Sequence, residues 1–116
     1  MKVLVTGHEG YIGQVLVPLF RRAGHEILGV DSRLFGDCDF GEAPEAVTSL
    51  SSDIRDIPDE AFDGVDAVVH LAAISNDPLG DLNPDCTYDI NHRATVTVAE
   101  KAKAAGVSRF LFSSSC

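Results

Sequence analysis

The sequence has few cysteines and few basic residues, and each scarcity excludes a class of protein. Of its 116 residues only Cys38, Cys86 and Cys116 are cysteines, and no two of them form a CxxC pair. That pattern indicates neither a disulfide framework nor a zinc site. Nine basic residues stand against eighteen acidic ones, and the net charge of −9 repels nucleic-acid phosphates and anionic membrane surfaces. We therefore expect no nucleic-acid partner and no membrane partner.

Long apolar stretches are also lacking. The first apolar run covers only residues 3–5, too short for the core of a signal peptide, and nowhere do about eighteen apolar residues follow one another. We therefore expect a cytoplasmic protein that is neither exported nor membrane-spanning. The four histidines show no i, i+4 pair and no cysteine at ligand spacing, so no metal site is expected.

What the sequence does contain is an alternation of short apolar runs with helical patterns. Its 45% of hydrophobic residues suits one globular domain over residues 1–116. Apolar spacing predicts helices over 11–23, with a bend at Pro18, and over 84–105. It predicts strands over 3–5, 27–30, 47–50, 67–71 and 109–113, and a loop over 32–44. This alternation indicates the fold class α/β, with a Rossmann-type doubly wound parallel sheet that binds ligands beyond the carboxyl ends of its strands.

Gly7, Gly10 and Gly13 lie between the first strand and the first helix. Glycines there permit a tight turn, a close approach of the backbone to a diphosphate, and tight packing of helix on strand. The amino end of the helix adds unpaired N–H groups and partial positive charge. The turn is therefore a candidate site for the pyrophosphate of a dinucleotide, although this spacing alone is weak evidence.

Asp31 ends the second predicted strand, eighteen residues after Gly13. An acidic side chain there accepts hydrogen bonds from an adenosine ribose and repels the 2′-phosphate of NADP, by ~1 kcal/mol in water and up to ~4 kcal/mol at a protein surface. We therefore predict NAD as the cofactor, although Arg33 offers a competing group that can receive a phosphate. A P-loop is excluded because no Gly-Lys-Ser/Thr follows the glycines. A methyltransferase, which also combines such glycines with an acid, stays open on these residues alone.

Further motifs follow in an order that resembles the extended short-chain dehydrogenase/reductases. They are, in chain order, Thr6-Gly7-x-x-Gly10-Tyr11-Ile12-Gly13, Asp31, Asp53-Ile54, His70-Leu71-Ala72-Ala73, Asn91 and Ser113-Ser114-Ser115. Within this family the chain looks most similar to the amino-terminal part of the NAD-dependent nucleotide-sugar epimerases and dehydratases. The resemblance spans residues 2–116 and disfavours a methyltransferase.

The resemblance implies which residues bind NAD. The pyrophosphate would be lined by Gly7, Gly10, Tyr11, Ile12 and Gly13. The adenosine ribose would be surrounded by Asp31, Ser32 and Arg33, and the adenine by Asp53 and Ile54. The nicotinamide side would be flanked by Leu71, Ala72 and Ala73, with Ser113 also on the cofactor side.

Ser115 resembles the family's serine that hydrogen-bonds the reacting sugar hydroxyl, and it is the candidate catalytic residue. In this family a Tyr-x-x-x-Lys motif supplies the tyrosine that takes the hydroxyl proton. The chain lacks it, because Val15 follows Tyr11 and His92 follows Tyr88 at the lysine position. We therefore expect the NAD-binding part of a longer enzyme, without its substrate domain and inactive alone. The apolar run 110–112 favours the same truncation, since complete proteins rarely leave such a strand at an edge.

Several polar residues have two interpretations. His70 closes a buried strand and is predicted to be hydrogen-bonded structure rather than a group that orients the nicotinamide. Asn91 either bonds the sheet backbone near the site or is an exposed polar position. Asn76, Asp77 and Asp81 fit a loop that needs no substrate to explain it.

Two functions follow from these residues. The first is an NAD-dependent epimerase or dehydratase that oxidises a hydroxyl of a nucleotide sugar and returns the hydride. The alternative is a non-catalytic module that binds NAD and regulates a partner according to redox state. Helices that face away from the nucleotide site commonly pair in this family, so a homodimer is compatible with the resemblance.

Overall fold

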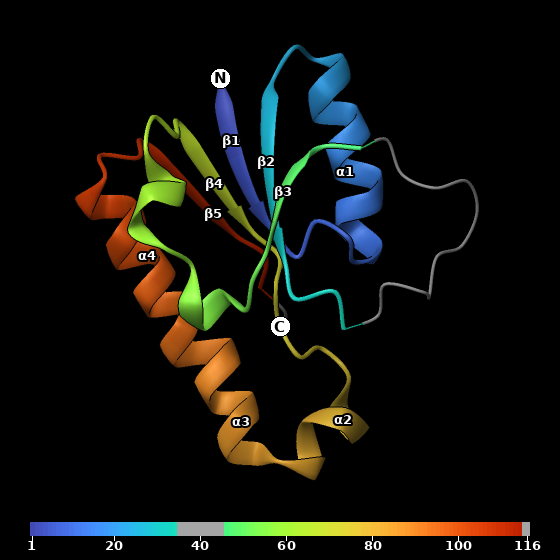
Figure 1. The fold of residues 1–116 in the computed structure, drawn as a ribbon. Coiled ribbons are helices and arrows are strands. Elements are labelled where there is room, and N and C mark those ends of the chain that lie inside the picture. Colours follow the sequence, from blue (N-terminus) through green and yellow to red (C-terminus); the bar gives the residue numbers. More distant parts are fainter. Residues whose placement is uncertain (35–45, 115–116) are drawn as a thin grey trace.

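A parallel sheet organises the chain, shown in Figure 1 as a computed structural model that describes residues 1–34 and 46–114. Within these residues five strands form one sheet in the order β3-β2-β1-β4-β5. They are β1 (Lys2–Thr6), β2 (Glu26–Asp31), β3 (Thr48–Ser51), β4 (Ala67–His70) and β5 (Arg109–Phe112). Every predicted strand is present with each end within one residue, which confirms the Rossmann-type α/β fold.

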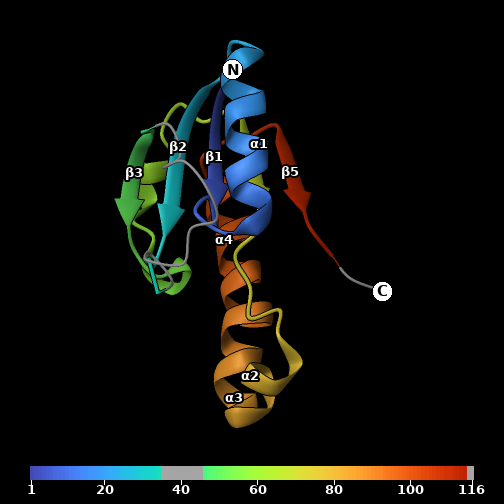
Figure 2. The ribbon, with the colours of Figure 1, turned by 90° about the vertical axis from the view of Figure 1, so that its right-hand side faces the viewer.

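Helices lie on both faces of this sheet (Figures 1 and 2). α1 (Tyr11–Arg22) connects β1 to β2 and continues through Pro18, as predicted. On the other face lie the 3₁₀ helices η1 (Ile54–Asp56) and η2 (Asp59–Phe62) and one long helix. That helix consists of α3 (Pro84–Tyr88), a π-helical segment η3 (Asp89–Ala94) and α4 (Thr95–Ala104). The helix expected over 84–105 is therefore confirmed, with a π-helical interruption that was not predicted.

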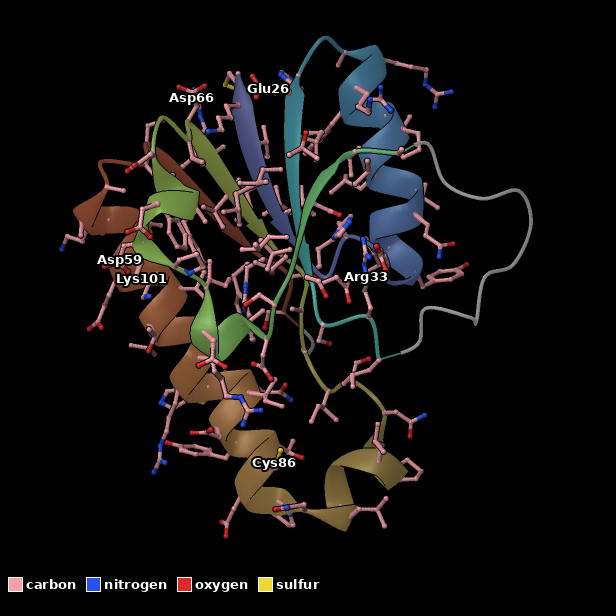
Figure 3. All side chains as sticks on the ribbon, in the orientation of Figure 1. Glu26, Arg33, Asp59, Asp66, Cys86 and Lys101 are labelled. Atoms are coloured by element: carbon pink, nitrogen blue, oxygen red, sulfur yellow. The ribbon has the colours of Figure 1, made fainter. Side chains whose placement is uncertain are left out.

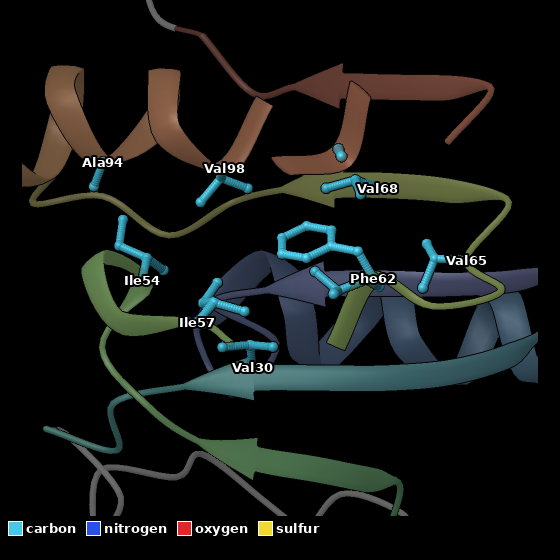
Figure 4. Packing of buried hydrophobic residues seen from close by; sticks show 10 residues of the cluster. Val30, Ile54, Ile57, Phe62, Val65, Val68, Ala94 and Val98 are labelled. Atoms are coloured by element: carbon cyan, nitrogen blue, oxygen red, sulfur yellow. The ribbon is translucent and has the colours of Figure 1, made fainter. Parts of the chain in front are cut away.

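The core has two layers because successive side chains of a strand point to opposite faces. Leu4 of β1 packs with Phe62 and Val98 on the side of α4, in the cluster drawn in Figure 4. Its neighbours Val3 and Val5 join the second cluster, on the side of α1. Such strands are buried on both faces, which explains why their sequences are continuously apolar.

A short helix follows β4 where the sequence favoured a loop. α2 (Asp77–Leu82) begins after Asn76, whose Oδ1 accepts a hydrogen bond from the N–H of Leu79 at 3.4 Å. Pro78 lies in its first turn, where a missing N–H costs nothing. The loop interpretation of this segment was therefore wrong, because asparagine and proline start helices as readily as they form turns.

Over 1–34 and 46–114 no helix is long and apolar enough to cross a membrane. The same residues contain no group of three His, Cys, Asp or Glu side chains that could hold a metal ion. Cys86 is a free thiol, whereas Cys38 and Cys116 lie outside the described residues.

Candidate functional site

The predicted site residues meet at the carboxyl end of the sheet. The register pairs Thr6 with both Val30 and His70, and it pairs His70 with Phe112. The strands therefore end at one level, and the residues that end or follow them lie side by side. These are Gly7, Asp31, Leu71 and Ser113. The strand order reverses between β1 and β4, which is where open parallel sheets bind ligands.

The turn between β1 and α1 requires glycine at two positions. Gly7 has a φ of +69°, and a Cβ there would crowd the backbone of Ala72. A Cβ on Gly13 would overlap the backbone of His8. The N–H of Gly7 donates to the carbonyl of Val30 at 2.8 Å and so ties the turn to β2. The glycines thus allow α1 to begin close against the ends of its neighbouring strands.

The amino end of α1 suits an anion. Gly10 precedes the helix, no described side chain caps it, and no acidic residue lies in its first turn. The helix therefore presents N–H groups and partial positive charge that a diphosphate can use. Tyr11 and Ile12 are 87% and 53% exposed, which leaves this end accessible. The residues present here fit the pyrophosphate of a dinucleotide.

Asp31 is held in place by two backbone groups. Its Oδ2 accepts from the N–H of Glu9 at 3.1 Å, and its Oδ1 accepts from the N–H of Arg33 at 2.9 Å. The guanidinium of Arg33 turns away to Glu9, with Nε 3.1 Å from Oε1, and to the Oγ of Ser49 at 3.0 Å. Ser32, which lies between Asp31 and Arg33 in the sequence, is exposed. The acidic group predicted for the ribose is therefore fixed at the end of β2.

Asp53 follows β3, but its carboxylate is engaged by a neighbour. It accepts from the backbone N–H of Arg55 at 2.9 Å and from the Arg55 guanidinium at 2.8 Å. Hydrogen bonds from the Arg55 side chain hold the pKa of Asp53 below its usual range, against a smaller opposing effect of burial. Asp53 thus caps η1, and the side chain of Ile54 is buried in the core. Contact of these residues with adenine stays a prediction.

A chain of hydrogen bonds connects β1, β4 and the long helix. The Oγ1 of Thr6 lies 2.8 Å from His70 Nδ1, and His70 Nε2 lies 2.9 Å from the Oγ1 of Thr95. Thr6 Oγ1 already accepts from the N–H groups of both Leu71 and Ala72, and Thr95 donates to the carbonyl of Asn91. Thr6 must therefore donate to Nδ1, and Nε2–H must donate to Thr95. These partners assign a neutral His70 with its proton on Nε2.

His70 is hydrogen-bonded structure, as predicted. The residue is 1% exposed, and burial lowers its pKa to about 4. Its ring also stacks on Phe112, with centroids 5.9 Å apart. The imidazole therefore stays neutral at neutral pH and links β1 to α4 through its hydrogen bonds.

Asn91 holds the segment after β4 with both ends of its amide. Its Oδ1 accepts from the N–H of Ile74, and its Nδ2 donates to the Ile74 carbonyl, each at 2.8 Å. Thr6 Oγ1 adds a bond from the N–H of Ala72 at 3.3 Å. The structure thus favours the interpretation that Asn91 bonds the backbone near the site. The π-helical segment η3 places the Asn91 side chain against the segment after β4. The backbone expected to flank the nicotinamide is fixed from both sides.

The structure describes Ser113 and Ser114 after β5, but not Ser115. Ser113 is exposed, and its N–H donates to the carbonyl of His70 at 3.2 Å. Ser115 lies outside the described residues, so its catalytic role stays a prediction.

Three residues near Asp31 were not predicted from the sequence. His8 is 6% exposed, its ring covers Gly29 so closely that a Cβ there would overlap it, and Glu9 and Ser49 hold Arg33. A cavity of about 160 Å³ lies beside them, lined by His8, Glu9, Gln14, Val17, Pro18, Arg33, Ala46, Val47 and Ser49. The available signals were two titratable residues inside the glycine turn and a glycine in the middle of β2.

The fold and this site define a class of protein. A glycine turn, an uncapped helix end and a fixed carboxylate meet at the switch point of a parallel sheet, as in dinucleotide-binding Rossmann domains. The sequence model of the NAD dependent epimerase/dehydratase family matches residues 3–116. The chain therefore belongs to this family, which confirms the resemblance and excludes a methyltransferase.

Individual relatives agree with the family. L-arabinose 1-dehydrogenase (NAD(P)(+)) of Haloferax volcanii is 34% identical over 97% of this chain and 40% of its own length. UDP-glucose 4-epimerase of Klebsiella pneumoniae is 33% identical over 99% of this chain and 89% of that sequence. A crystal structure of UDP-glucose-4-epimerase from Stenotrophomonas maltophila, with bound NAD and formylated UDP-arabinopyranose, is 29% identical with a TM-score of 0.87.

The cofactor prediction is confirmed at the level of the family, which is NAD-dependent, and two solved structural neighbours of the chain contain bound NAD. The chain is much shorter than the first two curated relatives and than the S. maltophila protein. It spans 40% and 35% of the first two curated relatives, and 37% of the S. maltophila structure.

Proposed function

We propose that this chain is the NAD-binding part of an NAD-dependent nucleotide-sugar epimerase or dehydratase. The observation that carries the proposal is the meeting of the Gly7 turn, the amino end of α1 and the fixed Asp31 carboxylate at one point of the sheet. The UDP-glucose 4-epimerases among its relatives support a nucleotide-sugar substrate. The substrate domain and the catalytic tyrosine and lysine would belong to the rest of a longer protein.

Each part of the cofactor has candidate partners in this chain. Bound NAD would supply a reversible hydride acceptor. The first turn of α1 would donate N–H groups to the pyrophosphate, with Gly7, Gly10 and Gly13 keeping the backbone close. Asp31 would accept hydrogen bonds from the adenosine ribose, and Asp53 and Ile54 would lie beside the adenine. The segment that Thr6 and Asn91 hold, residues 71–74, would position the nicotinamide.

Ser115 tests the catalytic part of the proposal. We expect Ser115→Ala in the full-length protein to lower kcat for UDP-glucose or a related nucleotide sugar about a hundredfold, because a hydrogen bond to the reacting hydroxyl is lost. NAD affinity, measured by calorimetry, should stay within a factor of about two, since the serine is assigned to the sugar. Ser108→Ala serves as the control, because Ser108 directly precedes β5, at the end opposite Ser115, where its Oγ donates to the backbone carbonyl of Asp66.

Unchanged turnover in Ser115→Ala would remove Ser115 from the mechanism. A full-length protein that binds NAD but turns over no nucleotide sugar would instead support the non-catalytic module.

A further inference from the structure

Arg33 lies next to the predicted ribose site, yet its guanidinium is already occupied. Its Nε lies 3.1 Å from Glu9 Oε1, and its Nη2 lies 3.0 Å from Ser49 Oγ. We propose that Glu9 is a specificity-determining residue, which selects NAD over NADP by withholding Arg33 from a 2′-phosphate. This inference rests on the proposed function, because it concerns the same cofactor site.

The Glu9–Arg33 pair lies directly beside the carboxylate assigned to the ribose. Asp31 accepts one hydrogen bond from the backbone of Glu9 and one from the backbone of Arg33. The side chains of these two residues then close a ring by their ion pair. We call Asp31, Glu9 and Arg33 the ribose triad. A ribose bound to Asp31 would place its 2′ position next to the ion pair.

Charge and donor geometry both favour NAD at this triad. Arginine is suited to a phosphate because its planar guanidinium presents several N–H donors. The triad contains two carboxylates and one guanidinium, which is paired with Glu9, so an approaching 2′-phosphate meets a net negative charge. The donors on Nε and Nη2 are also committed to Glu9 and Ser49. The attraction that Arg33 offers to a phosphate is therefore cancelled by Glu9.

The surroundings make Glu9 a suitable residue to change. The side chains of Arg33 and Glu9 are 50% and 27% exposed, and such ion pairs add little to folding stability. Glu9→Gln keeps the shape of the side chain and removes its charge. The backbone N–H that donates to Asp31 remains, so the ribose carboxylate stays in place.

The test compares direct binding of NAD and NADP to the full-length protein by calorimetry. In Glu9→Gln we expect the ratio of the NADP Kd to the NAD Kd to fall about tenfold, equivalent to ~1.4 kcal/mol. Adding Arg33→Gln to this variant should abolish the gain, because the released guanidinium is its source. Ser49→Ala should shift the ratio in the same direction by a smaller factor, since it frees Nη2 without a change of charge.

Glu26→Gln is the matched control. It makes the same charge change, but Glu26 is exposed at the start of β2, whereas Arg33 follows the other end of that strand (Figure 3). Its Kd ratio should equal that of the wild type.

An unchanged ratio in Glu9→Gln, in a protein that still binds NAD, would overturn the inference and leave the proposed function standing. A gain that survives Arg33→Gln would overturn it too, because Arg33 would then not be the group released. A wild-type protein that binds neither nucleotide would overturn the proposed function itself.

Discussion

At the scale of single residues, His70 links burial to the pH dependence of stability. Its folded pKa is lowered to about 4 by burial, against 6.5 for an ordinary histidine. Between pH 6.5 and about pH 4 the unfolded chain therefore carries a proton on His70 that the folded chain lacks. The free energy of unfolding decreases as the pH falls through this range. Above pH 6.5 His70 is neutral in both the folded and the unfolded chain, so the stability that is lost toward acid is fully present. Its upper size is roughly 3 kcal/mol, from a pKa difference of about two and a half units.

His70→Gln tests this linkage by urea denaturation between pH 7.5 and 4.5. The variant should be less stable at pH 7.5, because the hydrogen bonds to Thr6 and Thr95 are disturbed. Its stability should fall less steeply toward acid, since glutamine has no group that takes up a proton in the unfolded chain. His92→Gln, at an exposed position, should keep the wild-type slope. Equal slopes in His70→Gln and the wild type would contradict the assignment of a neutral buried His70.

At the scale of elements, the contact between α1 and the preceding turn determines the site. Gly13→Ala would drive a Cβ into the backbone of His8, so α1 must shift away from β1. We expect a stability loss of about 1–3 kcal/mol, as in other overpacked contacts. NAD affinity should fall at least about tenfold, because the N–H groups at the helix end lose their position. Thermal unfolding and calorimetry measure the two effects.

Gly80→Ala is the control for this prediction. A Cβ on Gly80 would lie 3.6 Å from Thr87 Cγ2, an ordinary contact, and Gly80 lies in α2. Alanine in a helix should leave stability unchanged or raise it by up to ~1 kcal/mol. If Gly13→Ala behaved like Gly80→Ala, the close contact between turn and helix would not matter for the cofactor.

The same scale shows which elements can be predicted from sequence. The central strands β1 and β4 were predictable because burial on both faces makes them continuously apolar, and α1 because one apolar stripe packs on the sheet. α2 was missed because Asn76 and Pro78 suit a turn equally well. The π-helical segment was missed because it accompanies a tertiary contact, the bonds of Asn91 to Ile74. Local propensity does not encode such contacts.

The candidate site was predictable to a similar extent. Gly7, Gly13 and Asp31 have the predicted places because the ends of parallel strands meet at one edge. The sequence could not show that Arg55 occupies the carboxylate of Asp53, or that Glu9 occupies Arg33. Those pairings depend on side-chain directions at the ends of different strands, which only the folded chain defines.

At the scale of the whole molecule, charge and binding act in opposite directions. The chain carries a net charge of −9, which opposes the approach of an anionic dinucleotide at long range. Attraction must therefore come from local donors, and the amino end of α1 provides them. The chain spans 40% and 35% of its first two curated relatives.

A crystal structure of the full-length protein with NAD tests the central claim most directly. We expect the pyrophosphate at the amino end of α1, beside Gly7 and Gly13, and the adenosine ribose hydroxyls within hydrogen-bond distance of Asp31. NAD bound elsewhere, or none bound at saturating concentration in crystals that retain this sheet, would contradict the account.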